Sequence, residues 1–326
     1  DALQLQSLHL FSSLHSMSSA WKKKRVVVTG ATGFVGSVLV EHLLALGASV
    51  RAPMRSENYR ALSKKRSEIE WMEGDLREAD YCEQLLEGVD HIFHLASHRR
   101  NIDFHRKHCS DVMNGNIEMS LALIHAMKSH KKTSVTFFSS ANVPPAIDVI
   151  AVAQEQQLDG YVLGKAVSET LWLTAAHQLG FPLLIVRPVG VYGPRDTFSK
   201  DGNVIPSLMV KARDSKEVLQ VWGSGMQKRV FLYVDDLVQA VFTLIESDVH
   251  GIQYIAPTGM VTIAELAEQI RQIVNPSLTL QFDTTQPEGS RSIAVLPMHA
   301  TLESLQWTPL ADGLRKTYDG WVTKGK

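Results

Sequence analysis

Short apolar runs alternate with longer stretches of helical periodicity over the first 190 or so positions of the chain. β-Branched and aromatic residues predict strands at 25–29, 48–55, 69–72, 89–96, 134–138 and 182–186. Apolar residues at helical spacing predict helices that start after Gly36 and that cover 77–87, 116–127 and 162–178. This alternation predicts an α/β fold of Rossmann type, a doubly wound parallel sheet covered by helices on both faces.

The pattern changes after residue 187, where proline and glycine mark several loops. Short strands are predicted at 218–222 and 278–283, and helices at 204–213, 234–246 and 262–274. We therefore divide the chain into a Rossmann domain at 25–187, to which helix 234–246 returns, and a smaller mixed substrate region at 188–326. Residues 1–24 intersperse leucines with Ser, Gln and His, without the features of a signal peptide, and are interpreted as a native extension or a tag remnant.

Composition narrows the class of protein. The 326 residues carry 33 basic and 34 acidic side chains, a net charge of −1, which gives no reason to expect nucleic acid or a membrane surface as a partner. The two cysteines, Cys82 and Cys109, are too few for a disulfide framework and favour a reducing compartment, the cytoplasm.

A glycine-rich turn, Gly30-Ala31-Thr32-Gly33-Phe34-Val35-Gly36, connects the first predicted strand to the first helix. In this context glycines let the backbone approach a pyrophosphate, and the helix N-terminus offers it free N–H groups. The turn predicts dinucleotide binding, with a tight turn that binds nothing as the alternative. Two residues separate its first two glycines, where the general pattern has one.

The end of the second strand bears on which dinucleotide binds. No acidic residue stands there to bond the ribose hydroxyls, and Arg51, Arg55 and Ser56 are found instead. Arginine suits a phosphate, so the pattern favours NADPH over NADH, with a solvated basic loop as the alternative. Asp75, after the third strand, stands either where the adenine would lie or at the N-cap of the next helix.

A tyrosine, a lysine and a pair of serines suggest carbonyl reduction. Tyr161 and Lys165 lie four apart on a predicted helix and share a face. A phenol with a pKa of about 10 is a poor proton donor or base at neutral pH, and an adjacent ammonium lowers that pKa. Ser139 and Ser140 end the fifth strand, where ligands bind in open α/β sheets, and a serine hydroxyl could hold a carbonyl oxygen.

In combination, these residues resemble the extended short-chain dehydrogenase/reductase family, the NAD-dependent epimerase/dehydratase group. The matching motifs are Gly30-x-x-Gly33-x-x-Gly36, Asp75-Leu76, His94-Leu95-Ala96, Asn116, Ser140, Tyr161-x-x-x-Lys165 and Arg187-Pro188-x-x-Val191-Tyr192-Gly193-Pro194. The glycine spacing is this family's own variant. The resemblance implies that Ser140, Tyr161 and Lys165 are catalytic. Besides Arg51 and Arg55, it implies a cofactor site made of Gly30, Thr32, Gly33, Phe34, Val35, Gly36, Asp75, Leu76, Leu95, Ala96, Ser97, Asn116, Lys165, Pro188 and Val191.

The second half resembles nucleotide-sugar reductases of the GDP-L-fucose synthase type. The stretches that carry this are Asn203-Val204-Ile205-Pro206, Val221-Trp222-Gly223-Ser224-Gly225, Arg229-Val230-Phe231-Leu232-Tyr233-Val234-Asp235-Asp236 and Phe282-Asp283-x-x-x-Pro287-x-Gly289. The resemblance implies NADPH, a GDP-linked 4-keto-6-deoxy sugar, and a homodimer formed by the helices near 117–129 and 162–178. It places substrate contacts at Arg195, Asn203, Val204, Lys211, Val221, Trp222 and Arg229.

Two departures limit the expected reaction. Fucose synthases epimerise two carbons with a cysteine and a histidine, where this chain has Ala141 or Asn142, depending on the alignment, and Arg195. None of these can shuttle the proton. We therefore expect reduction of a keto group, at C4, of a nucleotide-linked deoxysugar. The alternatives are a redox-neutral epimerase that uses bound NAD and a nucleotide-binding protein without catalysis, for which the unusual stretch between Ser140 and Tyr161 leaves room.

A cluster of possible metal ligands, His105, His108, Cys109 and Asp111, fits no common zinc spacing. It is interpreted as a loop over the substrate cleft, with no metal.

Overall fold

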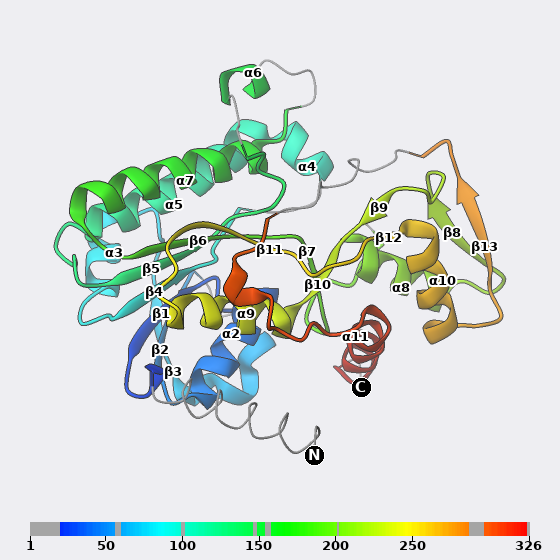
Figure 1. Ribbon diagram of the computed structural model, residues 1–326, viewed down its shortest axis with the longest axis horizontal. Helices are drawn as coiled ribbons and strands as arrows, with labels where there is room; N and C mark the ends of the chain where they lie inside the picture. The colour runs from blue at the N-terminus through cyan, green and yellow to red at the C-terminus, as the bar shows by residue number, and fades with distance from the viewer. Residues whose placement is uncertain are drawn as a thin grey trace.

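Seven strands form one parallel sheet in the order β11-β6-β5-β4-β1-β2-β3 (Figure 1). The computed structural model describes residues 20–55, 60–98, 102–145, 149–153, 158–200, 202–286 and 297–324. The strands of the sheet are β1 (Arg25–Thr29), β2 (Ser49–Met54), β3 (Ile69–Glu73), β4 (His91–His94), β5 (Ser134–Phe138), β6 (Leu183–Pro188) and β11 (Gly251–Ile255). The order reverses between β1 and β4, as in doubly wound dinucleotide-binding folds, and confirms the predicted fold class.

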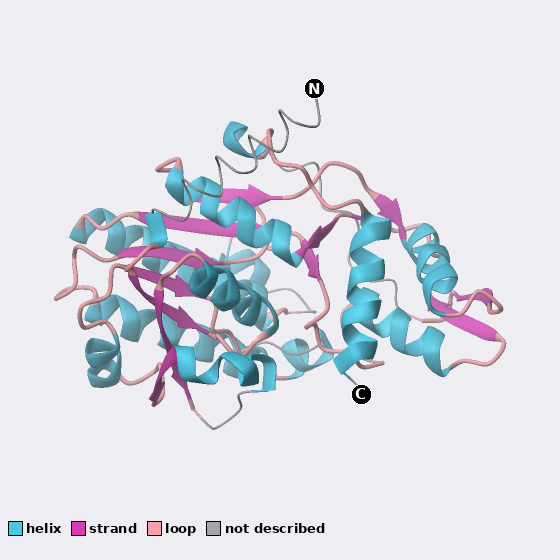
Figure 2. Ribbon diagram, turned by 90° about the horizontal axis from the view of Figure 1, so that it is seen from below, coloured by secondary structure: helices cyan, strands magenta, loops and turns pink. Residues whose placement is uncertain are grey.

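Helices cover both faces of the sheet (Figures 1 and 2). One face carries α2 (Phe34–Ala45) and α9 (Val234–Glu246); the other carries α3 (Ala79–Leu85), α5 (Cys109–Ala126) and α7 (Gly160–Leu179). Strand β1 shows why the strands are apolar throughout. Val26 and Val28 pack into the core under α2 and α9, and Val27 packs into the core under α5 and α7.

A smaller part lies beyond the carboxyl ends of the strands (Figure 1). It has three two-stranded pairings: β8 with β13, β7 with β10, and β9 with β12. Its own core includes Ile205, Leu219 and Leu266. The elements are β7 (Gly190–Tyr192), α8 (Val204–Asp214), β8 (Val218–Trp222), β9 (Lys228–Arg229), β10 (Phe231–Tyr233), β12 (Val261–Thr262), α10 (Ile263–Val274), β13 (Thr279–Asp283) and α11 (Leu310–Lys324). The remaining short elements are η1 (Arg60–Glu68), α4 (Ile102–Lys107), α6 (Val149–Ala153) and η2 (Ala300–Leu302).

The segment from His105 to Asp111 is helical, which corrects its interpretation as a loop. It comprises the end of α4 and the start of α5, which begins seven residues before the predicted Asn116. The first turn of α5 packs closely on α7, because a Cβ at Gly160 would lie 2.0 Å from the carbonyl oxygen of Cys109. This packing stabilises a helix in a stretch for which the polar composition had not predicted one.

The folded part begins before the first strand. Trp21 is buried, and its ring lies 5.4 Å from those of Phe93 and Phe242. Trp21 therefore belongs to the folded part, and residues 1–19 of the proposed extension are outside the described residues.

Candidate functional site

The glycine turn forms a cradle of bare backbone at the carboxyl end of β1. Gly30 has a φ of +69°, which favours glycine, and its carbonyl oxygen accepts a bond of 2.9 Å from the N–H of Gly33. A Cβ at Gly36 would lie 2.1 Å from the same oxygen. Helix α2 starts here with no side chain as its cap. A pyrophosphate would therefore find close backbone and an uncapped helix N-terminus, so this turn fits a dinucleotide.

Thr29 ties the glycine turn to the neighbouring strand end. Its Oγ1 accepts bonds of 3.0 Å from the N–H groups of Leu95 and Ala96 and lies 2.8 Å from Nδ1 of His94. With two donors on Thr29, we assign its own proton to His94. Burial, with a smaller effect of Lys165, lowers the pKa of His94 to about 3, so the ring is a neutral acceptor. This network holds residues 95–96 against Gly30.

Asn116 lies beside this network, but its amide is fully engaged within the protein. Its Oδ1 accepts from Ser97 Oγ (2.8 Å) and His98 N (2.9 Å), and its Nδ2 donates to the carbonyls of Val112 (2.8 Å) and His98 (3.3 Å). An amide offers two donors and two acceptor positions, and all four are used. This corrects the predicted direct cofactor contact: Asn116 positions Ser97 and His98.

The two arginines of the second strand point to different places. Arg51 is 7% exposed and donates to the carbonyls of Leu85 (2.8 Å) and Glu87 (3.0 Å), and its Nη2 lies 3.0 Å from Glu70. Its predicted contact with a cofactor phosphate is therefore wrong. Arg55 is exposed at the end of β2 and remains a candidate.

Asp75 also lies at this edge of the sheet. Hydrogen bonds from Arg77 hold the pKa of Asp75 below its usual value, and Arg55 contributes. Asp75 does not cap the next helix, which begins at Ala79 after Glu78. Leu76 is buried in the core, so only its backbone could reach a cofactor.

Tyr161 and Lys165 lie together at the carboxyl end of β5. Lys165 is 2% exposed, and its Nζ donates to the carbonyl of Phe138 (2.7 Å) and lies 5.9 Å from the centre of the Tyr161 ring. Ser140 follows two residues after Phe138 and is partly exposed, and its Oγ accepts from Asn142 N (3.2 Å). Ser139 is 5% exposed, with its Oγ buried.

The start of α7 is held by a side chain that the sequence analysis did not single out. Asp159 Oδ1 accepts from the N–H of Tyr161 (2.9 Å) and, more weakly, of Val162 (3.4 Å). Asp immediately before a helix is a recognised N-cap signal. His105 was assigned to a loop over the substrate cleft and given no role of its own, yet its ring lies against that of Tyr161.

The loop after β7 meets the glycine turn. A Cβ at Gly193, where this loop begins, would lie 3.2 Å from the Phe34 ring. Pro188, the last residue of β6, and Val191, in β7, precede it and are partly buried. Arg195 donates from Nη1 to the carbonyl of Ser37 (3.1 Å) and forms an ion pair with Glu41, both on α2. Its predicted contact with substrate is therefore corrected: Arg195 fastens this loop to α2.

The predicted substrate residues of the smaller part differ in how exposed their side chains are. Lys211 Nζ lies 4.4 Å from the centre of the Trp222 ring, which is 47% exposed. Val221 is 1% exposed, because alternate residues of β8 face the core, so only its backbone could contact a substrate. Burial lowers the pKa of the Arg229 guanidinium, which stands in β9. Asn203 precedes α8, where Val204 is the first residue, and donates to Asp196 (3.1 Å).

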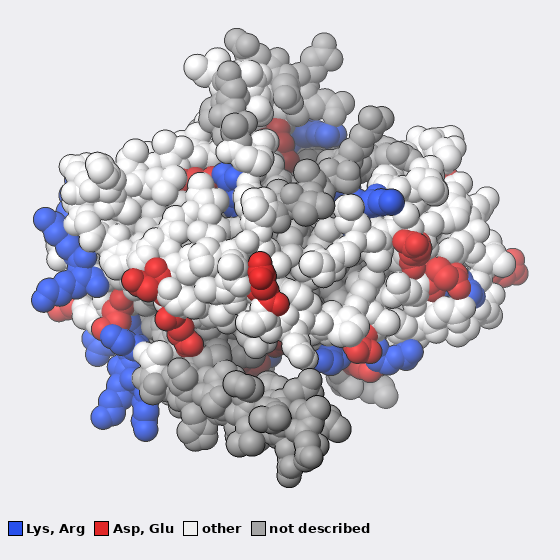
Figure 3. All heavy atoms as spheres, viewed as in Figure 1, with Lys and Arg blue, Asp and Glu red and all other residues white. Residues whose placement is uncertain are grey.

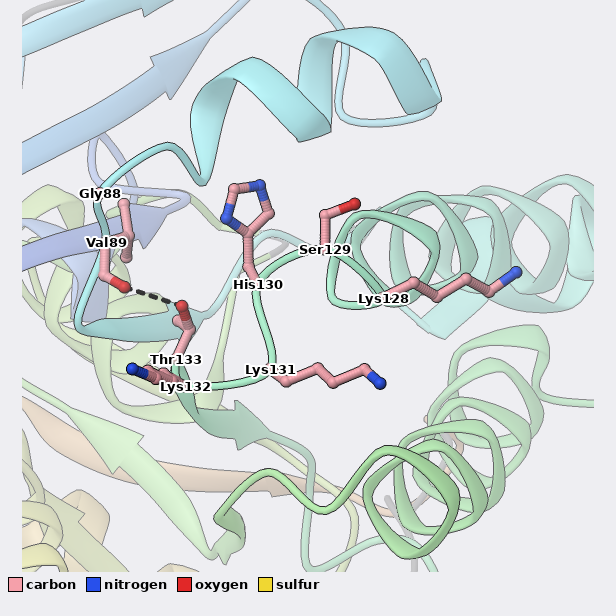
Figure 4. Close-up of a pocket in the computed structure, with 8 residues that line it drawn as sticks. All are labelled: Gly88, Val89, Lys128, Ser129, His130, Lys131, Lys132 and Thr133. Carbon is pink, nitrogen blue, oxygen red and sulfur yellow. Dashed lines mark hydrogen bonds between the residues drawn. The ribbon is translucent and has the colours of Figure 1, made fainter.

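A hollow in the protein surface lies at the amino ends of the sheet strands, opposite to the end that carries the glycine turn. Figure 4 shows its lining: Gly88, Val89, Lys128, Ser129, His130, Lys131, Lys132 and Thr133. These residues precede β4 and β5, so they lie at the amino ends of the strands, away from the glycine turn. Figure 3 shows basic side chains gathered on the left side of the molecule.

No group of three or more His, Cys, Asp or Glu side chains among the described residues is arranged to hold a metal ion. Among those same residues, no helix has both the length and the apolar character that a membrane crossing requires.

Known proteins with similar sequences were found along most of the chain. The NAD dependent epimerase/dehydratase family matches residues 26–256. A dTDP-4-dehydro-6-deoxy-D-allose reductase from Streptomyces sp is 31% identical over 91% of this chain and 96% of its own length. GDP-L-fucose synthase 1 from Arabidopsis thaliana is 28% identical over 96% of this chain and 97% of its own.

A solved structure confirms the fold independently. The UDP-glucose 4-epimerase of Thermotoga maritima, with UDP-glucose, superimposes with a TM-score of 0.78 at 21% identity, covering 93% of this chain and all of the other.

Proposed function

Since the chain belongs to the NAD-dependent epimerase/dehydratase family, we propose that it reduces a keto group, at C4, of a nucleotide-linked deoxysugar with NADPH. The observation that carries this proposal is the placement of Tyr161 and Lys165 beside the strand end that leads to Ser140. The reductase from Streptomyces sp, whose name specifies a 4-dehydro-6-deoxy sugar, supports the substrate class.

Each side chain has a distinct task in this reaction. Bound NADPH supplies the hydride. The hydroxyl of Tyr161 donates a proton to the carbonyl oxygen as this oxygen gains charge. The ammonium of Lys165, fixed by the Phe138 carbonyl, stabilises the phenolate that remains. Ser140 accepts one bond from Asn142 and keeps its own proton to donate to the carbonyl oxygen.

Reduction without double epimerisation fits the neighbouring residues. Arg195 is paired with Glu41 on α2, and a guanidinium does not give up its proton in proteins. Asn142 and Ala141, at the other position, carry no acid–base group. A redox-neutral epimerase remains the alternative. Of the two arginines that favoured NADPH, Arg51 is bonded within the protein and only Arg55 still supports that cofactor.

The catalytic assignment is tested by three substitutions. Tyr161→Phe should abolish NADPH oxidation while cofactor binding, measured by fluorescence titration, stays nearly unchanged. Ser140→Ala should lower kcat by about 100-fold, as the loss of one oxyanion donor does. Ser139→Ala, the matched control with a buried hydroxyl, should change kcat little. If Ser139→Ala is the more damaging of the two serine variants, the assignment to Ser140 is wrong.

The nucleotide is tested directly by assaying GDP-, dTDP-, UDP- and CDP-linked 4-keto-6-deoxy sugars. We propose GDP, on the resemblance of the stretches around Asn203, Trp222 and Arg229 to fucose synthases. A clear preference for dTDP would align the chain with the Streptomyces reductase instead.

We also infer a homodimer in the cytoplasm. The paired helices α5 and α7 expose Leu121 (37%) and Leu173 (38%), which suits an apolar interface. The thiols of Cys82 and Cys109 are free, as a reducing compartment maintains them. Sedimentation of the Leu121→Glu, Leu173→Glu double variant should give a monomer where the parent gives a dimer.

A further inference from the structure

A buried histidine lies flat against the proposed catalytic tyrosine, and the reaction above makes no use of it. The rings of His105 and Tyr161 are 5.3 Å apart between centres and inclined by 17°, a stacked arrangement. His105 is 5% exposed. A titratable side chain is rarely buried to this degree without a partner or a task.

Asp159 connects the two residues. Its Oδ1 caps α7 at the N–H of Tyr161 and lies 3.6 Å from Nδ1 of His105. One carboxylate therefore fixes the backbone of Tyr161 and restrains the imidazole that covers the tyrosine ring. The ammonium of Lys165 also lies near this ring, with Nζ 5.9 Å from its centre.

Helix α4 brings His105 to this place. It packs against both α5 and α7 and continues into α5 through a bond from His108 N to the Phe104 carbonyl (2.9 Å). The ring of the neighbouring His108 stacks on Phe104 instead, and its Nδ1 pairs with Asp111. Of these two histidines, His105 is therefore the one whose ring faces that of Tyr161.

From these contacts we propose that His105 is a positioning residue that holds the ring of Tyr161 at the angle required for proton donation. The inference rests on the proposed catalytic role of Tyr161. Catalytic groups need placement to within about half an ångström, and a tyrosine ring can rotate about two side-chain bonds. A flat partner on one face restricts that rotation, and the useful property of His105 is its planar ring.

The substitutions His105→Phe and His105→Leu separate the planar ring from mere filling of space. His105→Leu should lower kcat by about three- to tenfold, the equivalent of one aromatic pair, with KM for NADPH and sugar unchanged. His105→Phe retains a flat ring and should restore kcat to within about twofold of the parent. His108→Leu, the control on the same segment, should leave kcat unchanged.

A spectroscopic measurement reports the ring without any turnover. In protein labelled with fluorotyrosine, the resonance of residue 161 is identified by its loss in Tyr161→Phe. We expect this fluorine resonance to shift and broaden in His105→Leu, and to stay narrow in His105→Phe.

The outcomes distinguish this inference from the proposed function. If Tyr161→Phe is inactive and His105→Leu keeps full kcat and a narrow resonance, the positioning role is wrong and the proposed function stands. If His105→Phe is as impaired as His105→Leu in a folded protein, the planar ring is not what matters and the inference also fails. If Tyr161→Phe remains fully active, the proposed function itself fails.

Discussion

Two arginines that are equivalent in the sequence have different surroundings in the structure. Arg51 and Arg55 stand four apart on the same predicted strand end, and both suited a phosphate. Only Arg55 is exposed there, whereas Arg51 is buried among two carbonyls and Glu70. Of the two arginines, therefore, only Arg55 supports a contact with the phosphate of NADPH.

Arg55→Ala should raise KM for NADPH by about tenfold or more, since a charge-assisted bond to phosphate is lost. KM for NADH should change little. Steady-state kinetics with both cofactors provides the measurement. Equal effects on the two cofactors would remove the case for a 2′-phosphate contact.

Arg51→Ala serves as the matched comparison. It should leave the NADPH preference intact and lower the free energy of unfolding by about 2 kcal/mol or more, because buried carbonyls and Glu70 lose their partner. A lost NADPH preference with normal stability would reverse the roles given to the two arginines.

Residue types were easier to predict than side-chain directions. Tyr161 and Lys165 lie together because four residues separate them on one helix, and this spacing is a local property of the sequence. The direction of Val221 could also have been deduced, since alternate residues of a half-buried strand face opposite sides. The partner of Arg195 could not, because Glu41 lies far away in the sequence and no local pattern links the two.

At the scale of elements, the junction of β1 and α2 is tightly constrained. Its glycines are required by contact, since the Gly30 carbonyl occupies the space of a side chain at Gly36. The sequence predicted this junction well, because glycine is required at each position where a side chain would clash with nearby backbone.

Gly36→Ala should displace the turn and weaken NADPH binding by at least about tenfold, because the backbone can no longer approach the pyrophosphate closely. Isothermal titration calorimetry measures the affinity. Ser37→Ala, at the next residue of α2, removes a bond to the Phe34 carbonyl without adding volume and should bind NADPH almost as well. Unchanged affinity in Gly36→Ala would contradict the cofactor site proposed for this turn.

Helix α5 shows what local patterns leave out. Its first two turns were not predicted, and they are helical because they pack on α7 at Gly160. Such tertiary support cannot be read from one segment alone.

For the molecule as a whole, two buried histidines couple stability to pH. Burial lowers the pKa of both His91 and His94 to about 3. Histidine in an unfolded chain titrates at about 6.5. Between these values the unfolded state binds more protons, so acid favours unfolding.

We expect the free energy of unfolding to fall as the pH drops below about 6, by up to about 1.4 kcal/mol per pH unit for each histidine. Urea unfolding across this range measures the slope, and His94→Gln should reduce it. The exposed His177, replaced by Gln, should not. A slope that is the same in His94→Gln and in the parent would show that His94 does not carry this dependence.

The central claim is that the molecule reduces its sugar and consumes NADPH in doing so. The most direct measurement counts NADPH oxidised against nucleotide sugar converted, with GDP- and dTDP-linked 4-keto-6-deoxy sugars as substrates and Tyr161→Phe as the blank. We expect equal amounts of NADPH oxidised and sugar reduced, and no conversion in the blank. Conversion of the sugar to an isomer with no net loss of NADPH would contradict the account and identify an epimerase.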